Sequence, residues 1–179
     1  MASVNLTNQI NACRKCRLWK DAKHAVLGEG PANARLMLVG QNPGKEEDRT
    51  GRPFVGRTGK FLNHVLSEHG IERESIFITS AVKHCTPQNR KPKPDEVEAC
   101  MPYLTEQVRL VKPYAILLMG TVAWQAPGEE GIVYLEAFHP SAAMCFPKIE
   151  RNSLKTSKHK KTSLSLPQPA FLSRKAQTL

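Results

Sequence analysis

Short apolar runs, each bounded by glycine, proline or polar residues, recur along the chain and predict buried β-strands. Four such runs lie at residues 36–39, 76–82, 115–119 and 132–138. Because a strand that is buried on both faces is apolar throughout rather than at alternate positions, these runs are typical of a parallel sheet.

The segments between these runs have the apolar spacing of amphipathic helices. Residues 58–69 place their apolar side chains on one helical face, and Gly70 follows them as a C-cap. Residues 95–111 follow Pro94 and carry acidic side chains in the first turn, where these complement the helix dipole. The alternation of strands and helices predicts an α/β protein, with a mostly parallel sheet of four strands covered by helices on both faces.

The length and charge of the chain suggest how it is divided. Its 179 residues suit one domain with a substantial core, and no apolar stretch is long enough to span a membrane. The net charge is +10, and residues 151–179 contribute seven Lys and Arg and no acidic residue. Because the hydrophobic pattern also stops near residue 149, we expect a folded domain over residues 1–150 and a basic, flexible tail over residues 151–179. Nucleic acid is a plausible partner, although charge alone does not establish it.

Four cysteines form two pairs along the chain. Two residues separate Cys13 from Cys16, and fourteen separate Cys85 from Cys100. Two such pairs can place four thiolates around one metal centre, and basic neighbours such as Lys15 favour the thiolate form. The alternatives are buried thiols or disulfides. The N-terminus lacks the apolar stretch of a signal peptide, so we expect a cytoplasmic protein in reducing surroundings that disfavour disulfides. The sequence therefore predicts a metal or iron–sulfur site.

Three segments at the ends of predicted strands carry residues suited to bind a ligand. Residues 38–48 turn sharply after the first strand, where Gly40 lets the backbone approach a ligand closely. Residues 51–56 place Phe54 on a Gly- and Pro-rich loop, where the ring either stacks on a nucleobase or anchors the loop in the core. His139 ends the last strand. Because the ends of parallel strands converge, one crevice can receive all three segments.

Together these segments resemble the family-four uracil-DNA glycosylases, the iron–sulfur branch of the uracil-DNA glycosylase superfamily. The resemblance covers about residues 13–148 and keeps the order of the family's motifs. The matching motifs are Cys13-Arg-Lys-Cys16, Gly28-Glu-Gly-Pro31, Val39-Gly-Gln-Asn-Pro-Gly44, Glu47-Asp48, Gly51-Arg-Pro-Phe-Val-Gly56, Phe77-Ile-Thr-Ser-Ala-Val-Lys83, Asn89-Arg90 and His139-Pro140. Each motif alone is weakly specific, whereas the ordered set is highly specific.

This resemblance implies a three-layer α/β/α sandwich and a [4Fe–4S] cluster. The cluster would be held by Cys13, Cys16, Cys85 and Cys100. The resemblance also implies a DNA-repair enzyme that hydrolyses the N-glycosidic bond of uracil in single- or double-stranded DNA and leaves an abasic site. We expect the enzyme to be a monomer.

The resemblance further assigns roles within the predicted crevice. The deoxyuridine would flip into a pocket, where Phe54 stacks on the uracil ring. His139 would donate a hydrogen bond to the anionic uracil, and Asn42 would orient the attacking water, because a neutral amide cannot act as a strong base. The base would be held by Gly40, Gln41 and Ser80, and the cationic sugar would be supported by Glu47 and Asp48.

The chain departs from the family's pattern in several places. Gln41-Asn42 stands where the family usually has Glu-Ala, and Ser80 stands where an Asn usually reads the base with a donor and an acceptor. The segment between Gly120 and His139 is short, and the residues after 149 lack the expected amphipathic helix. Two alternatives therefore stay open: a non-catalytic module that binds uracil-containing or single-stranded DNA, and a small zinc-stapled protein that binds nucleic acid.

Overall fold

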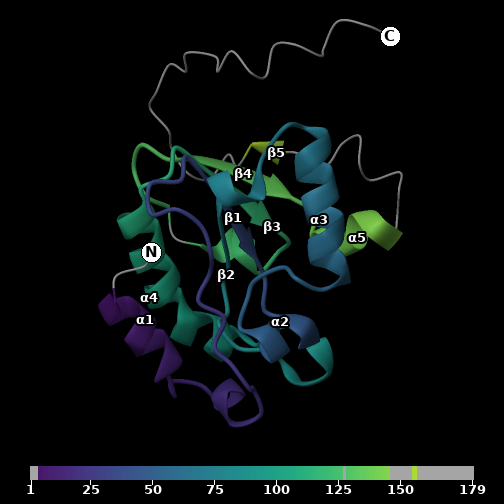
Figure 1. Ribbon diagram of the computed structural model, residues 1–179. Helices are drawn as coiled ribbons and strands as arrows, with labels where there is room; N and C mark the ends of the chain where they lie inside the picture. Colours follow the sequence, from purple (N-terminus) through teal and green to yellow (C-terminus); the bar gives the residue numbers. More distant parts are fainter. Residues whose placement is uncertain (1–3, 127, 146–154, 157–179) are drawn as a thin grey trace, which may run out of the picture.

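A computed structural model describes residues 4–126, 128–145 and 155–156 (Figure 1). The strands are β1 (Leu36–Gly40), β2 (Phe77–Ser80), β3 (Ala115–Met119), β4 (Val133–Ala137) and β5 (Lys155–Thr156). The α-helices are α1 (Val4–Asn11), α2 (Lys45–Thr50), α3 (Arg57–Glu68), α4 (Pro94–Val111) and α5 (Pro140–Cys145). Short 3-10 turns lie at Arg17–Lys20, Arg73–Ser75, Pro87–Asn89 and Ala123–Gln125. Every strand and helix that the hydrophobic pattern predicts is present, with boundaries that differ by one or two residues.

Within the described residues the strands form one sheet in the order β2-β1-β3-β4-β5. β1 pairs in parallel with β2 and β3, and β3 pairs in parallel with β4, which confirms the expected parallel sheet of four strands. The two-residue β5 pairs antiparallel with β4. The hydrophobic pattern does not predict β5, because Lys155–Thr156 has no apolar residue. The rest of the expected tail lies outside the described residues.

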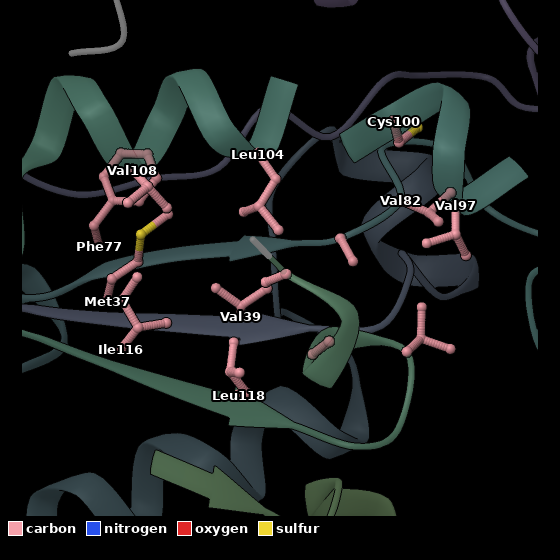
Figure 2. Packing of buried hydrophobic residues seen from close by; sticks show 14 of the residues in the cluster. Met37, Val39, Phe77, Val82, Val97, Cys100, Leu104, Val108, Ile116 and Leu118 are labelled. Atoms are coloured by element: carbon pink, nitrogen blue, oxygen red, sulfur yellow. The ribbon is translucent and has the colours of Figure 1, made fainter. Parts of the chain in front are cut away.

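One face of the sheet packs against α4. Met37 and Val39 of β1 and Ile116 and Leu118 of β3 all point to this face and are completely buried (Figure 2). All four pack against the same surface of α4, which consists of Val97, Cys100, Leu104, Val108 and Val111. The core therefore fixes the register of α4 against the sheet.

The opposite face of the sheet packs against α3. Leu38 of β1 and Ile78 of β2 point to this face, because successive side chains of a strand alternate between the two faces. They pack against Leu62 and Leu66 of α3, and Phe54 joins the cluster from the loop that precedes this helix. Helices thus cover both faces of the sheet (Figure 1), which confirms the three-layer α/β/α arrangement.

Helix α1 lies outside α4 and adds a further layer on that side of the molecule (Figure 1). Leu6 and Ile10 of α1 pack against Tyr103 of α4, together with Cys13 from the segment that follows α1. This packing brings the N-terminal cysteines to α4. No helix in the described part of the chain is both long and apolar enough to cross a membrane.

Candidate active site

A cavity of about 380 Å³ opens at the carboxyl-terminal ends of β1, β2 and β4. This edge is where open α/β sheets bind ligands, and the volume lies in the range of small-molecule sites. The predicted site residues that line the cavity are Gln41, Asn42, Glu47, Phe54, Ser80 and His139. Gly40 and Asp48 are not among its lining residues.

The chain turns sharply after β2 and crosses the end of β1. The Ala81 N–H donates to the Gly40 carbonyl at 2.9 Å, and the Val82 N–H donates to the Gln41 carbonyl at 3.0 Å. The strand predicted over residues 76–82 therefore ends at Ser80. This turn places Ser80 next to the segment after β1 at the edge of the cavity.

Phe54 is both a wall of the cavity and an anchor in the core. Its ring is only 8% exposed and packs in the hydrophobic cluster under α3. The ring also stacks on the His139 imidazole, with centroids 6.2 Å apart and planes inclined by 30°. Gly40 makes room for it, because a Cβ at that position would lie 2.5 Å from Phe54 Cζ. Gly40 therefore shapes the cavity indirectly, by admitting the ring that borders it.

The backbone at Phe54 is strained and is held from two sides. Its φ of +51° lies in the left-handed region, which residues other than glycine seldom adopt. On one side the Arg73 guanidinium donates to the carbonyls of Pro53 at 2.6 Å and Phe54 at 3.4 Å. On the other side the Glu47 carboxylate accepts from the N–H groups of the next two residues, at 2.9 and 2.8 Å. Contacts of this kind let a structure keep an unfavourable φ at a functional site.

His139 follows β4 and is held in one tautomer. Its Nδ1 lies 2.8 Å from Ser141 Oγ and accepts a hydrogen bond of 3.3 Å from the Ser141 backbone N–H. Because Nδ1 accepts, the neutral ring carries its proton on Nε2. Burial lowers the pKa of His139 and outweighs the opposing charge of Glu47. The ring is therefore neutral near pH 7 and offers Nε2–H as a hydrogen-bond donor.

Asn42 borders the cavity with its amide held at the nitrogen. Nδ2 donates to the Pro43 carbonyl at 3.1 Å, to Thr86 Oγ1 at 3.3 Å and to Asn89 Oδ1 at 3.3 Å. Because these contacts engage the nitrogen, Oδ1 is the atom that can accept a hydrogen bond in the cavity.

Gln41 and Ser80 lie at opposite sides of the β1 end. A Cβ at Gly120 would lie 2.9 Å from Gln41 Nε2, so the close approach of this side chain requires a glycine there. The Ser80 carbonyl accepts a hydrogen bond of 2.6 Å from the ammonium group of Lys83. Lys83 is completely buried, also bonds to Gln107 Oε1 at 2.6 Å, and has its pKa lowered to about 7 by burial. This buried network ties the end of β2 to α4.

The two acidic residues expected near the sugar have different positions. Glu47 borders the cavity, and its Oε2 also accepts from the Gly44 N–H at 3.0 Å. Asp48 points elsewhere: its Oδ1 accepts from the backbone N–H groups of Lys23 at 2.9 Å and His24 at 3.3 Å. Neighbouring residues of a helix face different directions, so the two carboxylates of α2 serve different segments. The structure thus places Asp48 in the link to the N-terminal segment and not in the cavity.

Other lining residues come from segments that the sequence interpretation treated as a helix, a motif or a loop, without a role at the cavity. They are Thr58 at the start of α3, Asn89, Arg90 and Lys91 in the Pro-rich loop, and Ser141 in α5. The basic, Pro-rich character of residues 86–94 was the available signal, because a loop of this kind seldom packs in a core. Lys91 places positive charge at the cavity, whereas the charge of Arg90 is paired with the Glu96 carboxylate.

The four cysteines come from three segments and all carry free thiols. Cys13 and Cys100 are buried, whereas Cys16 and Cys85 are partly buried. Cys16 packs against the core cluster that contains Cys100, and Cys13 packs with Tyr103 of the same helix, α4. Burial raises the pKa of Cys16, Cys85 and Cys100, which differs from the expectation that basic neighbours favour the thiolate. A bound metal centre would offset this effect by stabilising the thiolates directly.

The surroundings of these thiols include a buried histidine. In the part of the chain that the structure describes, no three His, Cys, Asp or Glu side chains are arranged to bind one metal ion. An iron–sulfur cluster is larger than one ion, so its four thiolate ligands stand farther apart. His84, beside Cys85, is buried, and its Nδ1 lacks a hydrogen-bond partner within the described residues. An N–H at this position can donate to the sulfur of a thiolate-bound metal centre, so the residues are compatible with such a centre.

Comparisons with known proteins identify the family of the chain. The chain matches the uracil DNA glycosylase superfamily over residues 27–177. It is 36% identical over 171 residues to a type-4 uracil-DNA glycosylase of Saccharolobus solfataricus, which covers 82% of this chain and 79% of the relative. A type-4 uracil-DNA glycosylase of Sulfurisphaera tokodaii is 35% identical over 171 residues, with 82% and 77% covered. A type-5 uracil-DNA glycosylase of Pyrobaculum aerophilum is 32% identical over 138 residues, with 69% and 61% covered. The chain therefore belongs to the uracil-DNA glycosylase superfamily.

Proposed function

We propose that this protein is a DNA-repair glycosylase that hydrolyses the bond between uracil and deoxyribose in DNA and leaves an abasic site. The observation that carries the proposal is the cavity at the strand ends, which the Phe54 ring, the His139 imidazole and the Asn42 amide all border. The similarity to type-4 uracil-DNA glycosylases supports the same reaction. Because a base inside a duplex cannot reach such a cavity, the deoxyuridine must first turn out of the stack.

The flipped uracil is proposed to lie against the Phe54 ring. Stacking on an aromatic side chain contributes roughly 1–3 kcal/mol per base. The ring is held in the core below the cavity, so it presents its surface without a change of rotamer on binding. Gln41 and Ser80 line the same cavity and are proposed to supply polar groups for the edge of the base.

Fixed charges and dipoles stabilise the transition state in this mechanism. As the glycosidic bond breaks, the base becomes negative and the sugar becomes positive. The His139 Nε2–H donates to the uracil oxygen that becomes negative, and the neutral ring does so without giving up its proton. The Glu47 carboxylate borders the same cavity and favours the cationic sugar. Asp48 has no role at the sugar in this proposal, because its carboxylate faces the N-terminal segment.

Asn42 is proposed to orient the attacking water. Its Oδ1 accepts a hydrogen bond from the water, while Nδ2 stays bound to the protein. The water oxygen forms a bond to the anomeric carbon of the sugar as the bond to the base nitrogen breaks. The electron pair of that bond leaves with the uracil, and the proton released by the water restores neutral uracil.

The finer proposal concerns the metal centre. We infer that one [4Fe–4S] cluster is bound by Cys13, Cys16, Cys85 and Cys100. When bound, the cluster supplies cross-links between the N-terminal segment, the Pro-rich loop and α4. Hydrolysis transfers no electrons, so these cysteines serve the structure of the site. A brown protein that absorbs near about 400 nm and contains iron would support this assignment, whereas a colourless protein that contains zinc would contradict it.

The activity is tested with oligonucleotides that contain one uracil, in single- and double-stranded form, followed by alkaline cleavage at abasic sites. We expect strand breaks at the uracil and none in the matched thymine substrate. His139→Ala should abolish most of the activity. The control His64→Ala changes a histidine on α3 whose side chain is 69% exposed, and it should leave the rate unchanged. Tight binding without strand breaks would instead identify a non-catalytic binding module.

A further inference from the structure

The Thr86 hydroxyl connects the Pro-rich loop to the cavity. Thr86 is 2% exposed, and its Oγ1 donates to the Arg90 carbonyl at 2.6 Å. The same oxygen accepts the hydrogen bond of 3.3 Å from Asn42 Nδ2. The hydroxyl therefore uses its single proton within the loop and its lone pair on Asn42. Toward Asn42, Thr86 Oγ1 can therefore only accept a hydrogen bond, because its proton is already donated to Arg90.

The loop that carries Thr86 is held in a single shape. Gln88 and Asn89 both have φ of +54°, an unfavourable left-handed conformation for two successive residues that are not glycine. Arg90 anchors the far end of the loop through two hydrogen bonds of 2.8 and 2.6 Å to the completely buried carboxylate of Glu96. The near end follows Cys85 directly. Such a loop presents the Thr86 oxygen at a fixed position.

An asparagine amide can turn by half a rotation and exchange its oxygen and nitrogen. The two acceptors at Thr86 and Asn89 select the orientation in which Nδ2 faces the loop. The opposite orientation would place Asn42 Oδ1 against Thr86 Oγ1, whose proton is already given to Arg90. It would therefore leave two acceptors facing each other.

We propose that Thr86 is a positioning residue that fixes the orientation of the Asn42 amide, so that Oδ1 faces the water of the proposed hydrolysis. The role of the water rests on the proposed function, whereas the orientation of the amide does not. The loop that the cysteines hold would in this way act on the rate of the reaction.

The proposal is tested with Thr86→Val, which keeps the branched shape of the side chain and removes the hydroxyl, and with Thr86→Ser, which keeps the hydroxyl. In single-turnover excision of uracil we expect Thr86→Val to be slower by roughly tenfold, with a Kd for the substrate that changes less than about twofold. Thr86→Ser should keep a rate within about twofold of the wild type. Thr105→Val is the matched control, since Thr105 donates to the Met101 carbonyl on α4 away from the cavity. Its rate should equal that of the wild type.

The hydroxyl also supports the loop, so Thr86 and Thr86→Val are compared a second time in proteins that also carry Asn42→Ala. If Thr86 acts through Asn42, Thr86→Val causes no further loss there. An equal loss in both backgrounds would mean that the substitution only loosens the loop, and the proposal would be wrong. A Thr86→Val protein as fast as the wild type would also overturn it.

A neutron crystal structure of Thr86→Val, in which the amide oxygen and the deuterated amide nitrogen are told apart directly, separates this proposal from the proposed function. The Asn42 amide should be turned or spread over two orientations relative to the wild type. An unchanged orientation would overturn the proposal even if the wild type excised uracil. If the wild type had no glycosylase activity, a turned amide would still support the positioning role and only the proposed function would fail.

Discussion

Single residues at the cavity are fixed by partners that are distant in the sequence. Asn42 and Thr86 are 44 positions apart, and Arg73 is 19 positions from the Phe54 carbonyl that it holds. The motifs in the sequence identified Phe54, Asn42 and His139 as candidates, because each lies in a short local pattern. Their partners could not be predicted, since spacing along the chain says nothing about a contact between two loops.

The pH dependence of uracil excision should follow His139. Burial lowers its pKa from the ordinary value of 6.5, so the imidazole stays neutral above that pH. Protonation would put a hydrogen on Nδ1, which could then no longer accept from Ser141. We expect a constant single-turnover rate above about pH 6.5 and a decline as the pH falls through the lowered pKa. An acid limb centred above pH 6.5 would contradict the assignment of a neutral donor.

Ser80 is the residue at which we expect base selectivity to be adjustable. It lies at the end of β2, borders the cavity and is 3% exposed. A hydroxyl matches only part of the uracil edge, whereas an amide offers both a donor and an acceptor. Ser80→Asn should therefore raise the excision rate on uracil by about tenfold and change the rate on hypoxanthine less. The comparison needs both proteins on both substrates, and equal rates throughout would show that Ser80 does not set specificity.

At the scale of elements, the sequence predicted most of what carries the cavity. Each parallel strand is an apolar run, and strand ends meet at one edge by topology alone, so the location of the cavity followed from the pattern. The short helices α1, α2 and α5 were not predicted, because six to eight residues hold too little periodicity to distinguish a helix from a turn. Asp48 was assigned to the sugar from the family resemblance alone, and without the helix α2 its direction relative to Glu47 was unknown.

The link between the Pro-rich loop and α4 should depend on Glu96. Its carboxylate accepts two hydrogen bonds from Arg90 and one of 2.8 Å from the Lys93 N–H, and the Arg90 hydrogen bond lowers its pKa from 4.5. A lowered folded-state pKa means that this stabilisation is present above pH 4.5 and is lost as the pH falls through the lowered value. Glu96→Gln should reduce the free energy of unfolding by about 1–3 kcal/mol at neutral pH.

Urea unfolding of the two proteins at neutral pH and at about pH 4 measures this effect. The difference between Glu96→Gln and the wild type should shrink at the lower pH. Glu98→Gln provides the control, since Glu98 is an exposed residue on the same helix. A difference that does not change with pH would show that the stabilisation comes from packing and not from the charge.

Cys100 should be needed for the proposed metal centre, because it is the one proposed ligand that lies on α4. Cys100→Ser should lower the iron content of the purified protein and its resistance to thermal unfolding, since the cross-link to α4 is removed. Cys145→Ser is the control, because Cys145 lies outside the cysteine pattern of the sequence. Unchanged iron content and stability in Cys100→Ser would exclude it as a ligand.

At the scale of the whole molecule, the charge is separated from the residues that carry the proposed chemistry. The chain has a net charge of +10, whereas its first 150 residues carry only +3. The sequence predicts this separation without a structure, because charge is counted and needs no contacts. Contacts in the cavity depend on the flipped base, whereas contacts of basic residues with phosphates depend on the salt concentration. The two contributions to DNA binding can therefore be measured separately.

The basic residues after β5 should add DNA affinity that is independent of sequence. Deleting residues 157–179 removes five Lys and Arg and keeps the strand β5. Because a Lys or Arg that neutralises a phosphate releases counterions, the plot of log affinity against log salt concentration should become less steep. The expected change in slope is about 0.9 for each phosphate that the shortened protein no longer neutralises. Kd is measured for a duplex without uracil between about 50 and 200 mM salt, so that only this electrostatic contribution is observed.

A full-length protein with the same five residues changed to Gln should behave like the deletion, since the effect comes from charge and not from length. Equal slopes for the deletion and the wild type would show that these residues do not bind DNA. The single-turnover rate at saturating protein should be unchanged in both variants, because the cavity that performs the proposed hydrolysis is formed by residues before position 142.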